Sequence, residues 1–291
     1  MKVLITGGSG QVGFELQRQF CCFGTVLAPT RQQLDLASGE AVAEYLSQHQ
    51  PTLILNAAAY TAVDNAESEP QQASRLNSEL PAQLAGYAAK HDAMLVHYSS
   101  DYVYGGNGQT PWQEDDAPAP LNVYGVTKLA GDNAVLASGC KALILRTSWV
   151  YSARGANFMR TMLRLGQARD SLSIVNDQVG APTPARLIAL LTQMAVARQL
   201  TGLFHVAPRG ETTWHGFAQA IFQHARACDV ALAVQPEKVV GIETQHYPTP
   251  AKRPLNSRLS VGKLEDALGV TLPSWQQQLA LTLDEALMNA H

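Results

Sequence analysis

The chain has 291 residues, of which 46% are hydrophobic, and a formal net charge of −3. This length and composition predict a globular protein with one large domain or two modest ones, and the slight negative charge argues against nucleic-acid binding. No apolar run approaches the roughly 20 residues of a membrane span, and the apolar run that begins at Val3 lacks the length of a signal peptide. We therefore expect a cytoplasmic protein without a nucleic-acid or membrane partner.

The cysteines and histidines show no spacing that is typical of a metal site. Cys21, Cys22, Cys140 and Cys228 include an adjacent pair but no CxxC or CxxH pattern, and the eight histidines show no ligand spacing either. We expect reduced thiols in or near the core, no disulfide framework and no metal site.

Short apolar runs alternate with helical patterns through the first half of the chain. We predict strands at 2–6, 25–28, 52–56, 94–99 and 141–146. This alternation predicts an α/β fold with a doubly wound parallel sheet of the Rossmann type. Beyond residue 150 the pattern loosens, with strands expected at 172–175 and 203–207 and helices after Pro184, after Thr213 and over about 275–289. The expected organisation is a dinucleotide-binding Rossmann domain at 1–150 and a smaller C-terminal α/β substrate-binding lobe at 151–291, between which the chain can recross.

The first predicted strand runs directly into a glycine-rich turn. Gly7 permits the tight turn, Gly10 lets the backbone approach a pyrophosphate at the start of the next helix, and Gly13 lets helix and strand pack closely, with Gln11 and Val12 between them. An ordinary glycine-rich turn is the alternative, but a strand before the turn and a helical pattern after it are the context that a dinucleotide fingerprint requires.

The end of the second predicted strand bears on cofactor choice. An acidic residue there would accept bonds from the ribose 2′-hydroxyl of NADH, but this chain has Thr30 and Arg31. A hydroxyl and a guanidinium suit a 2′-phosphate, so we predict NADPH, with NADH possible as a second cofactor. In the alternative, Arg31 simply faces solvent.

Tyr124 and Lys128 are separated by four residues and so share one face of a helix. A tyrosine can donate a proton to a reacting carbonyl, and a neighbouring ammonium lowers its pKa from about 10. Ser100 ends the fourth predicted strand, where open α/β sheets bind ligands, and its hydroxyl could hold the substrate carbonyl against Tyr124. The plain alternatives are a surface tyrosine covering a lysine stem and a serine that caps a loop; strand alternation turns Ser99 the other way.

A glycine loop at the N-terminus, a hydroxyl at a strand end and then YxxxK resemble the extended short-chain dehydrogenase/reductase family. Within that family the chain resembles the dTDP-4-dehydrorhamnose reductases, and six strings carry this likeness: NAAAYTAVDNAE at 56–67, YSSDYV at 98–103, PLNVYGVTKLAG at 120–131, RTSWV at 146–150, NDQVGAPT at 176–183 and YPTPAKRP at 247–254. The resemblance implies NADPH-dependent reduction of the 4-keto group of dTDP-4-dehydro-6-deoxy-L-mannose to dTDP-L-rhamnose, a step toward cell-surface polysaccharide such as lipopolysaccharide. It also implies a dTDP-sugar as the substrate.

The resemblance further implies roles for residues outside the catalytic set. On the cofactor side these residues are Asp35, Leu36, Ala57, Ala58 and Tyr60, and Lys128 would also bind the nicotinamide ribose. The implied substrate-binding residues are Asp101, Tyr102, Trp149, Asn157, Gln178 and Arg253. Asp101 could equally cap a turn, and Trp149 could equally be a core residue.

One departure from the family pattern concerns metal and assembly. Some members are dimers bridged by a divalent cation between glutamates; Glu15 occupies one of these positions, but Arg186 occupies the other. A bound Mg²⁺ is therefore doubtful, although a homodimer remains possible, and Glu15 and Arg186 could pair instead.

Two other functions stay open: a reductase that forms the 4-epimer dTDP-6-deoxy-L-talose, and a non-catalytic subunit similar to the regulatory subunit of methionine adenosyltransferase.

Overall fold

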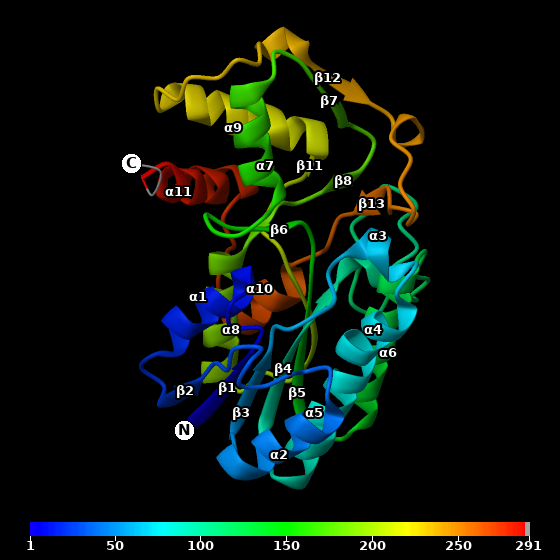
Figure 1. The fold of residues 1–291 in the computed structure, drawn as a ribbon, viewed down its shortest axis with the longest axis vertical. Coiled ribbons are helices and arrows are strands. Elements are labelled where there is room, and N and C mark those ends of the chain that lie inside the picture. Colours follow the sequence, from blue (N-terminus) through cyan, green and yellow to red (C-terminus); the bar gives the residue numbers. More distant parts are fainter. Residues whose placement is uncertain (289–291) are drawn as a thin grey trace.

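A six-stranded parallel sheet forms the lower half of the computed structural model, which describes residues 1–288 (Figure 1). Its strands follow the order β10-β5-β4-β3-β1-β2, and every neighbouring pair is parallel. This confirms the doubly wound α/β prediction. The bounds are β1 (Lys2–Thr6), β2 (Thr25–Leu27), β3 (Leu53–Asn56), β4 (Met94–Ser100), β5 (Lys141–Thr147) and β10 (Gly202–Val206).

Helices cover both faces of this sheet because consecutive strand residues point to opposite faces. Val3 and Leu53 pack on one side, whereas Leu4 and Ile54 pack on the other. The first side is covered by α1 (Gln11–Phe20), α8 (Ala185–Ala197) and α10 (Gly262–Leu268). The second is covered by α2 (Gly39–His49), α5 (Leu80–Lys90) and α6 (Val123–Ala137). We call the sheet with these six helices the sheet lobe.

The strand order reverses between β1 and β3, and this reversal positions the cofactor loop. The chain proceeds from β1 outward to β2 and then returns to β3 on the other side of β1. Open α/β sheets bind ligands at such a switch point, beyond the carboxyl ends of the strands. Between β3 and α5 lie α3 (Val63–Ala66), α4 (Pro70–Ser74) and the π-helical turn η1 (Arg75–Glu79), and the short 3-10 helix η2 (Asp101–Val103) follows β4.

The upper lobe packs three helices around Phe217, Phe222 and Met159 (Figure 1). These helices are α7 (Phe158–Ala168), α9 (Trp214–Ala227) and α11 (Trp275–Met288). Its strands are short: β6 (Val150–Tyr151), β7 (Leu172–Val175), β8 (Val179–Gly180), β9 (Thr183–Pro184), β11 (Thr212–Thr213), β12 (Val239–Ile242) and β13 (Asn256–Ser257). The turns η3 (Pro236–Lys238) and η4 (Thr244–His246) flank β12.

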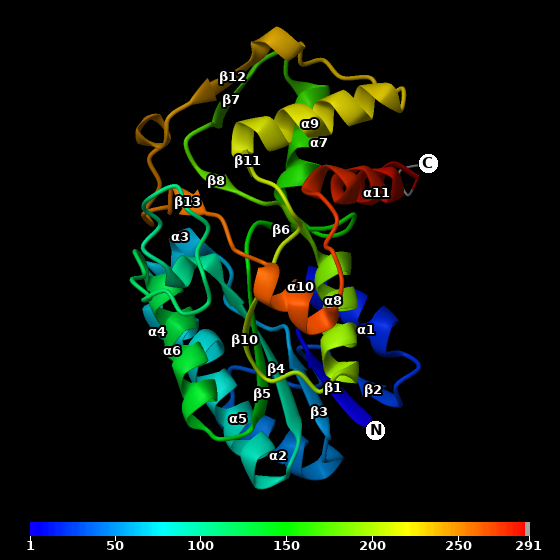
Figure 2. The same ribbon diagram turned by 180° about the vertical axis from the view of Figure 1, so that it is seen from behind.

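The chain returns to the sheet lobe after residue 150. Figure 2 shows α8 and α10 beside the large sheet and β10 at its edge, where β10 pairs with β5 along its whole length. An apolar run such as 203–207 cannot reveal which sheet it joins, because its pattern is the same in either lobe. The division at residue 150 stays a prediction about domains. Asn289, the expected end of the last helix, lies outside the described residues.

Two further expectations concern surface chemistry. Within residues 1–288, no helix combines the length and the apolar character needed to cross a membrane. Cys21, Cys22 and Cys228 are exposed free thiols, and only Cys140 is partly buried. The expectation that the thiols lie in or near the core was therefore wrong for three of the four, because these three occupy helix ends rather than apolar faces.

Candidate active site

Helix α6 positions the candidate proton donor at the carboxyl end of β4. The Asn122 side chain caps this helix by accepting from the Gly125 amide at 2.8 Å, and its Nδ2 donates to the Lys252 carbonyl. Gly125 allows close packing there, since a Cβ atom at this position would lie 2.2 Å from the Tyr102 carbonyl oxygen. One turn later, the buried Lys128 donates from Nζ to the Tyr98 carbonyl at 2.6 Å.

Ser100, Tyr124 and Lys128 are brought together here, as the sequence predicts. The Tyr124 hydroxyl hydrogen-bonds with Ser100, and the Ser100 Oγ donates to Asp101 Oδ1 at 3.0 Å. The Tyr102 ring packs edge-on against the Tyr124 ring with 5.3 Å between centroids. The Tyr124 hydroxyl therefore has a hydroxyl neighbour, and its ring packs against a second aromatic ring.

Burial controls the ionisation of this cluster. It raises the pKa of Tyr124 above its usual value, although the bond from Ser100 acts in the opposite direction. Burial also lowers the pKa of Lys128 to about 8, opposed by Asp132, and raises that of Asp101 to about 6. We expected the lysine to lower the tyrosine pKa, but the pKa of Tyr124 is raised, because desolvation is the largest influence on it. Tyr124 thus keeps its proton at neutral pH, as a proton donor must.

A network of buried polar residues surrounds Lys128. Asp132 lies one turn beyond Lys128 and pairs with the Arg146 Nε on β5 at 3.0 Å. His97 on β4 is fully buried, and its Nδ1 lies 3.1 Å from Asn56 Nδ2 on β3. Burial, followed by the charge of Lys128, holds the pKa of His97 well below its usual value, so the ring is neutral. Sequence reasoning did not identify Asp132, because only the fold brings it against β5.

The glycine loop after β1 fits a dinucleotide. Gly7 has φ +69°, and a Cβ there would lie 2.8 Å from the Ala58 amide nitrogen, at the end of β3. A Cβ at Gly13 would lie 2.1 Å from the Gly7 carbonyl oxygen, so helix and strand touch through backbone. Among the described residues no side chain caps the start of α1 at Gly10. Its first amide groups are therefore free to bind an anion such as a pyrophosphate.

Residues beside this loop are placed around the same switch point. Gln11 Oε1 accepts from Ser152 Oγ at 3.0 Å and thereby ties the loop to the upper lobe, while Val12 packs on the sheet core. Ala58 follows Ala57 at the end of β3 and donates from its amide to Thr6 Oγ1 at 3.4 Å. Tyr60 is held by Asn77 on η1, which accepts from its amide at 2.8 Å, and by Glu69, which accepts from its hydroxyl at 2.6 Å.

Thr30 and Arg31 follow β2 and are exposed. The Arg31 guanidinium makes no hydrogen bond or ion pair with any residue of the described range 1–288, so it is available to a ligand. Asp35 is also exposed and accepts from the Ala37 amide in a turn, whereas Leu36 packs against the core. The loop thus offers a cation and a hydroxyl with which to bind a 2′-phosphate.

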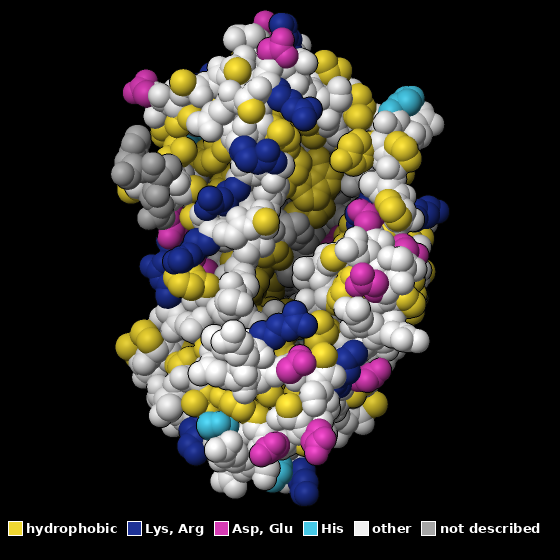
Figure 3. Space-filling model, in the orientation of Figure 1, with side chains coloured by type: hydrophobic (Ala, Val, Ile, Leu, Met, Phe, Trp, Pro, Cys, Tyr) yellow, Lys and Arg dark blue, Asp and Glu magenta, His cyan; other side chains and the backbone are white. Residues whose placement is uncertain are grey.

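Two stacked tryptophans, one after β5 of the sheet lobe and one at the start of α9 in the upper lobe, form what we call the aromatic wall. Trp149, at the end of β5, stacks on Trp214 of α9 with 3.7 Å between ring centroids, and both are partly exposed. Trp214 Nε1 donates to Gln178 Oε1 at 3.1 Å. Trp149 has φ +50°, a strained conformation for a side chain of this size. Figure 3 shows a deep hollow between the lobes, with hydrophobic side chains on its upper wall.

The remaining predicted substrate residues have protein partners. Arg253 forms an ion pair with Asp64 Oδ2 at 2.6 Å, and its Nη1 donates to the Tyr102 hydroxyl at 3.4 Å. Asn157 caps α7 by accepting from the Arg160 amide, and its Nδ2 donates to Gln11 Oε1 at 2.9 Å. Arg253 therefore lies at the edge of the catalytic cluster, while the present contacts of Asn157 are those of a helix cap between the lobes.

Sequence reasoning missed Trp214, Asn77 and Asp64. The string Thr213-Trp214 indicated only the start of a helix, which is correct because Thr213 caps α9. Asn77 is fully buried and also donates to Thr127 Oγ1, so it links the cofactor side to α6. An aromatic residue at the first position of a helix was the one available signal for Trp214.

The pair at Glu15 and Arg186 forms within the chain. Arg186 Nε lies 3.4 Å from Glu15 Oε2, and its Nη2 lies 2.7 Å from Glu285 Oε2. A guanidinium already occupies the place next to Glu15, so these residues do not fit a divalent cation.

Comparison with known proteins places this geometry in a family. A sequence model described as the RmlD substrate binding domain matches residues 1–288. A dTDP-4-dehydrorhamnose reductase from Shigella flexneri is 45% identical over 98% of both chains. The chain belongs to the RmlD family of dTDP-4-dehydrorhamnose reductases. The resemblance inferred from the strings is thereby confirmed.

Solved structures of the family extend the match to three dimensions. A dTDP-4-dehydrorhamnose reductase from Clostridium acetobutylicum superposes with a TM-score of 0.91 at 36% identity, covering 99% of this chain and 100% of that one. A Bacillus anthracis reductase in complex with NADP gives a TM-score of 0.90 at 32% identity, covering 98% and 99%. The fold therefore agrees with that of RmlD reductases along nearly its whole length.

Proposed function

We propose that this protein reduces the 4-keto group of dTDP-4-dehydro-β-L-rhamnose to give dTDP-L-rhamnose, with NADPH as cofactor. The observation that carries the proposal is the intact set of Ser100, Tyr124 and Lys128 at the carboxyl end of β4, in a chain that matches dTDP-4-dehydrorhamnose reductases from end to end. A retained catalytic set argues against a purely regulatory subunit.

Tyr124 gives the substrate its proton. NADPH supplies the hydride when bound, so the protein must supply a proton to the carbonyl oxygen. The Tyr124 hydroxyl is protonated at neutral pH because burial raises its pKa. The Ser100 hydroxyl lies next to that of Tyr124, and if its proton turns from Asp101 to the carbonyl oxygen it holds the ketone for transfer.

Lys128 tunes the donor. Its ammonium lies one helical turn from Tyr124, and a positive charge there stabilises the phenolate that forms as the proton leaves. Asp132 favours the charged form of this buried lysine, and Arg146 in turn neutralises Asp132. Lys128 is also the residue that would bind the nicotinamide ribose.

The glycine loop and Arg31 bind the cofactor phosphates in this proposal. The uncapped start of α1 receives the pyrophosphate, and the unpartnered Arg31 receives the 2′-phosphate. Thr30, Asp35, Leu36, Ala57, Ala58 and Tyr60 border the adenosine and ribose. From its composition and family likeness, we also propose that the protein is cytoplasmic and forms a homodimer.

The upper lobe holds the nucleotide-sugar. Trp149 and Trp214 offer a partly exposed aromatic face, and Gln178 fixes the indole of Trp214. Arg253 supplies a cation at the edge of the cluster that can exchange part of its contact with Asp64 for the diphosphate. Asp101 and Tyr102 border the sugar, and Asn157 stabilises the junction between the lobes.

The direct test is to incubate the purified protein with NADPH, dTDP-4-keto-6-deoxyglucose and a 3,5-epimerase, and to identify the product sugar by NMR. dTDP-L-rhamnose is the expected product. If the product is dTDP-6-deoxy-L-talose, the protein is a reductase that forms the other 4-epimer. If no NADPH is oxidised, the proposal is overturned in favour of a binding role.

A further inference from the structure

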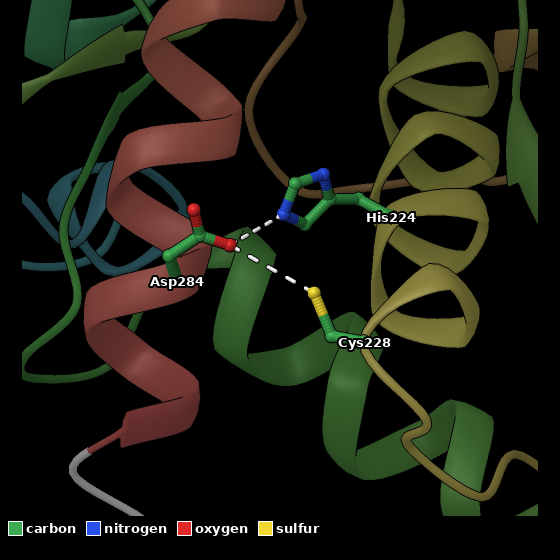
Figure 4. Close-up of side chains that lie close together, drawn as sticks. All are labelled: His224, Cys228 and Asp284. Atoms are coloured by element: carbon green, nitrogen blue, oxygen red, sulfur yellow. Dashed lines mark hydrogen bonds and ion pairs between the residues drawn. The ribbon is translucent and has the colours of Figure 1, made fainter.

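Three potential metal ligands meet on the upper lobe, away from the catalytic cluster. His224 and Cys228 lie at the end of α9, and Asp284 lies on α11 (Figure 4). In residues 1–288 this is the one group of three histidine, cysteine, aspartate or glutamate side chains that could hold a metal ion, and its ligand atoms all lie within 4.8 Å of one another.

The distances between the three ligand atoms are close to those around a bound metal ion. His224 Nε2 lies 2.6 Å from Asp284 Oδ1, and Cys228 Sγ donates to the same oxygen at 3.8 Å. Ligand atoms around a tetrahedral zinc ion are roughly 3.3–3.8 Å apart, given metal–ligand bonds of about 2.0–2.3 Å. A small outward rotation of the Asp284 carboxylate would therefore admit the ion.

Two of the ligands lie on helices, and Cys228 lies directly at the end of one. The Cys228 amide donates to the His224 carbonyl at 3.1 Å, so these two residues stand one helical turn apart. This spacing is neither CxxC nor CxxH, but it presents two ligands on one face, as the two histidines of an HExxH zinc motif are presented. The third ligand comes from α11, which packs against α9 in the core of the upper lobe. Sites built on helices hold their geometry better than sites on loops.

The donor set favours one class of metal. Imidazole and thiolate ligands suit zinc, whereas magnesium and calcium prefer oxygen ligands throughout. The side chains of His224 and Asp284 are 27% and 43% exposed, so an ion can reach the site and keep a water molecule as its fourth ligand.

We propose that His224, Cys228 and Asp284 bind a zinc ion that fastens the end of α9 to α11. Trp214 of the aromatic wall begins the same helix, 14 residues long and therefore roughly 20 Å from end to end. The ion is thus too far from Trp214 to touch the substrate, and its effect is to stabilise the upper lobe rather than to take part in the reaction.

The test uses the full chain with Cys21→Ser and Cys22→Ser, because this adjacent exposed pair could itself bind zinc. Titration with Co²⁺ should give a thiolate-to-metal charge-transfer band that saturates at one equivalent. Cys228→Ser should abolish the band, and His224→Ala and Asp284→Asn should each weaken zinc binding by at least ~10-fold. His246→Ala, at an exposed histidine elsewhere in the upper lobe, is the matched control and should change nothing.

Stability and thiol reactivity give independent readouts. Zinc at about ten times its Kd should raise Tm by ~3 °C and protect Cys228 from alkylation; a chelator should remove both effects, and Cys228→Ser should remove the rise in Tm. Turnover should be the same in His224→Ala and the parent. The proposal is overturned if no band forms at one equivalent, if the band survives in Cys228→Ser, or if the control loses as much affinity as His224→Ala.

Discussion

The proton-donor cluster of Ser100, Tyr124 and Lys128 and the stacked pair of Trp149 and Trp214 are built in different ways. Ser100 and Lys128 are buried, lie on regular elements of the sheet lobe and are bonded to backbone or to a neighbouring side chain. Trp149 and Trp214 are partly exposed, come from segments far apart in the chain and contact each other by stacking. In the proposed function, the sheet lobe performs the chemistry and the upper lobe binds the substrate. Substitutions in the two regions should therefore separate into effects on kcat and effects on KM.

The largest effect is expected from Tyr124→Phe. This change keeps the ring but removes the hydroxyl that carries the proton, and loss of a general acid costs roughly 10²–10⁴ in rate. Steady-state kinetics should show a collapse of kcat while NADPH binding, followed by fluorescence, persists.

Tyr102→Phe is the matched control, because its hydroxyl contacts Arg253 rather than Ser100. It should retain most of the turnover. Equal losses in the two variants would show that the cluster has no single donor.

The pH profile should report Lys128. Because burial lowers the pKa of this ammonium to about 8, it is charged below that pH and neutral above it. The kcat/KM for NADPH should then fall as pH rises through about 8, roughly tenfold for each further pH unit. In Lys128→Arg, whose guanidinium stays charged, the alkaline limb should disappear even if the maximum is lower. An unchanged limb in that variant would assign the titration to another group.

Trp214→Ala tests the other side of the comparison. Removing one face of the aromatic stack should raise KM for the dTDP-sugar by ~10-fold and leave kcat nearly unchanged, because the lost contact binds ground state and transition state alike. Phe158 also contacts the Trp214 ring, so Phe158→Leu serves as a control for general loosening of the upper lobe. A large drop in kcat with KM unchanged would mean that the wall belongs to the chemistry.

Arg31→Ala sharpens the comparison, because Arg31 lies on the sheet lobe but is exposed and unpartnered within residues 1–288. KM should rise several-fold for NADPH and hardly at all for NADH, since only NADPH carries the 2′-phosphate. This result would show that an exposed residue of the sheet lobe takes part in binding. The division between catalytic and binding residues would then follow burial rather than the lobe to which a residue belongs. Parallel increases for both cofactors would remove Arg31 from the cofactor site.

The features that could be predicted from the sequence lie mostly in the sheet lobe, and those that could not lie mostly where distant segments meet. The parallel sheet, the glycine loop and the set of Ser100, Tyr124 and Lys128 could be predicted, because each depends on periodicity or on a short spacing within one or two elements. Trp214 and Asp132 could not, since their roles depend on which distant segment packs against them. The membership of β10 in the large sheet escaped prediction for that reason, and so did the meeting of His224 and Cys228 with Asp284 across two helices.

The central claim is that the protein transfers hydride from NADPH to C4 of a dTDP-linked 4-keto sugar while Tyr124 supplies the proton. The most direct measurement uses NADPH deuterated at the transferred position of nicotinamide C4, followed by NMR of the sugar formed by the wild-type protein and by Tyr124→Phe. We predict deuterium at C4 of dTDP-L-rhamnose in the wild type and only traces of the same product in the variant. Deuterium that is absent from C4, or equal labelled product from both proteins, would contradict the claim.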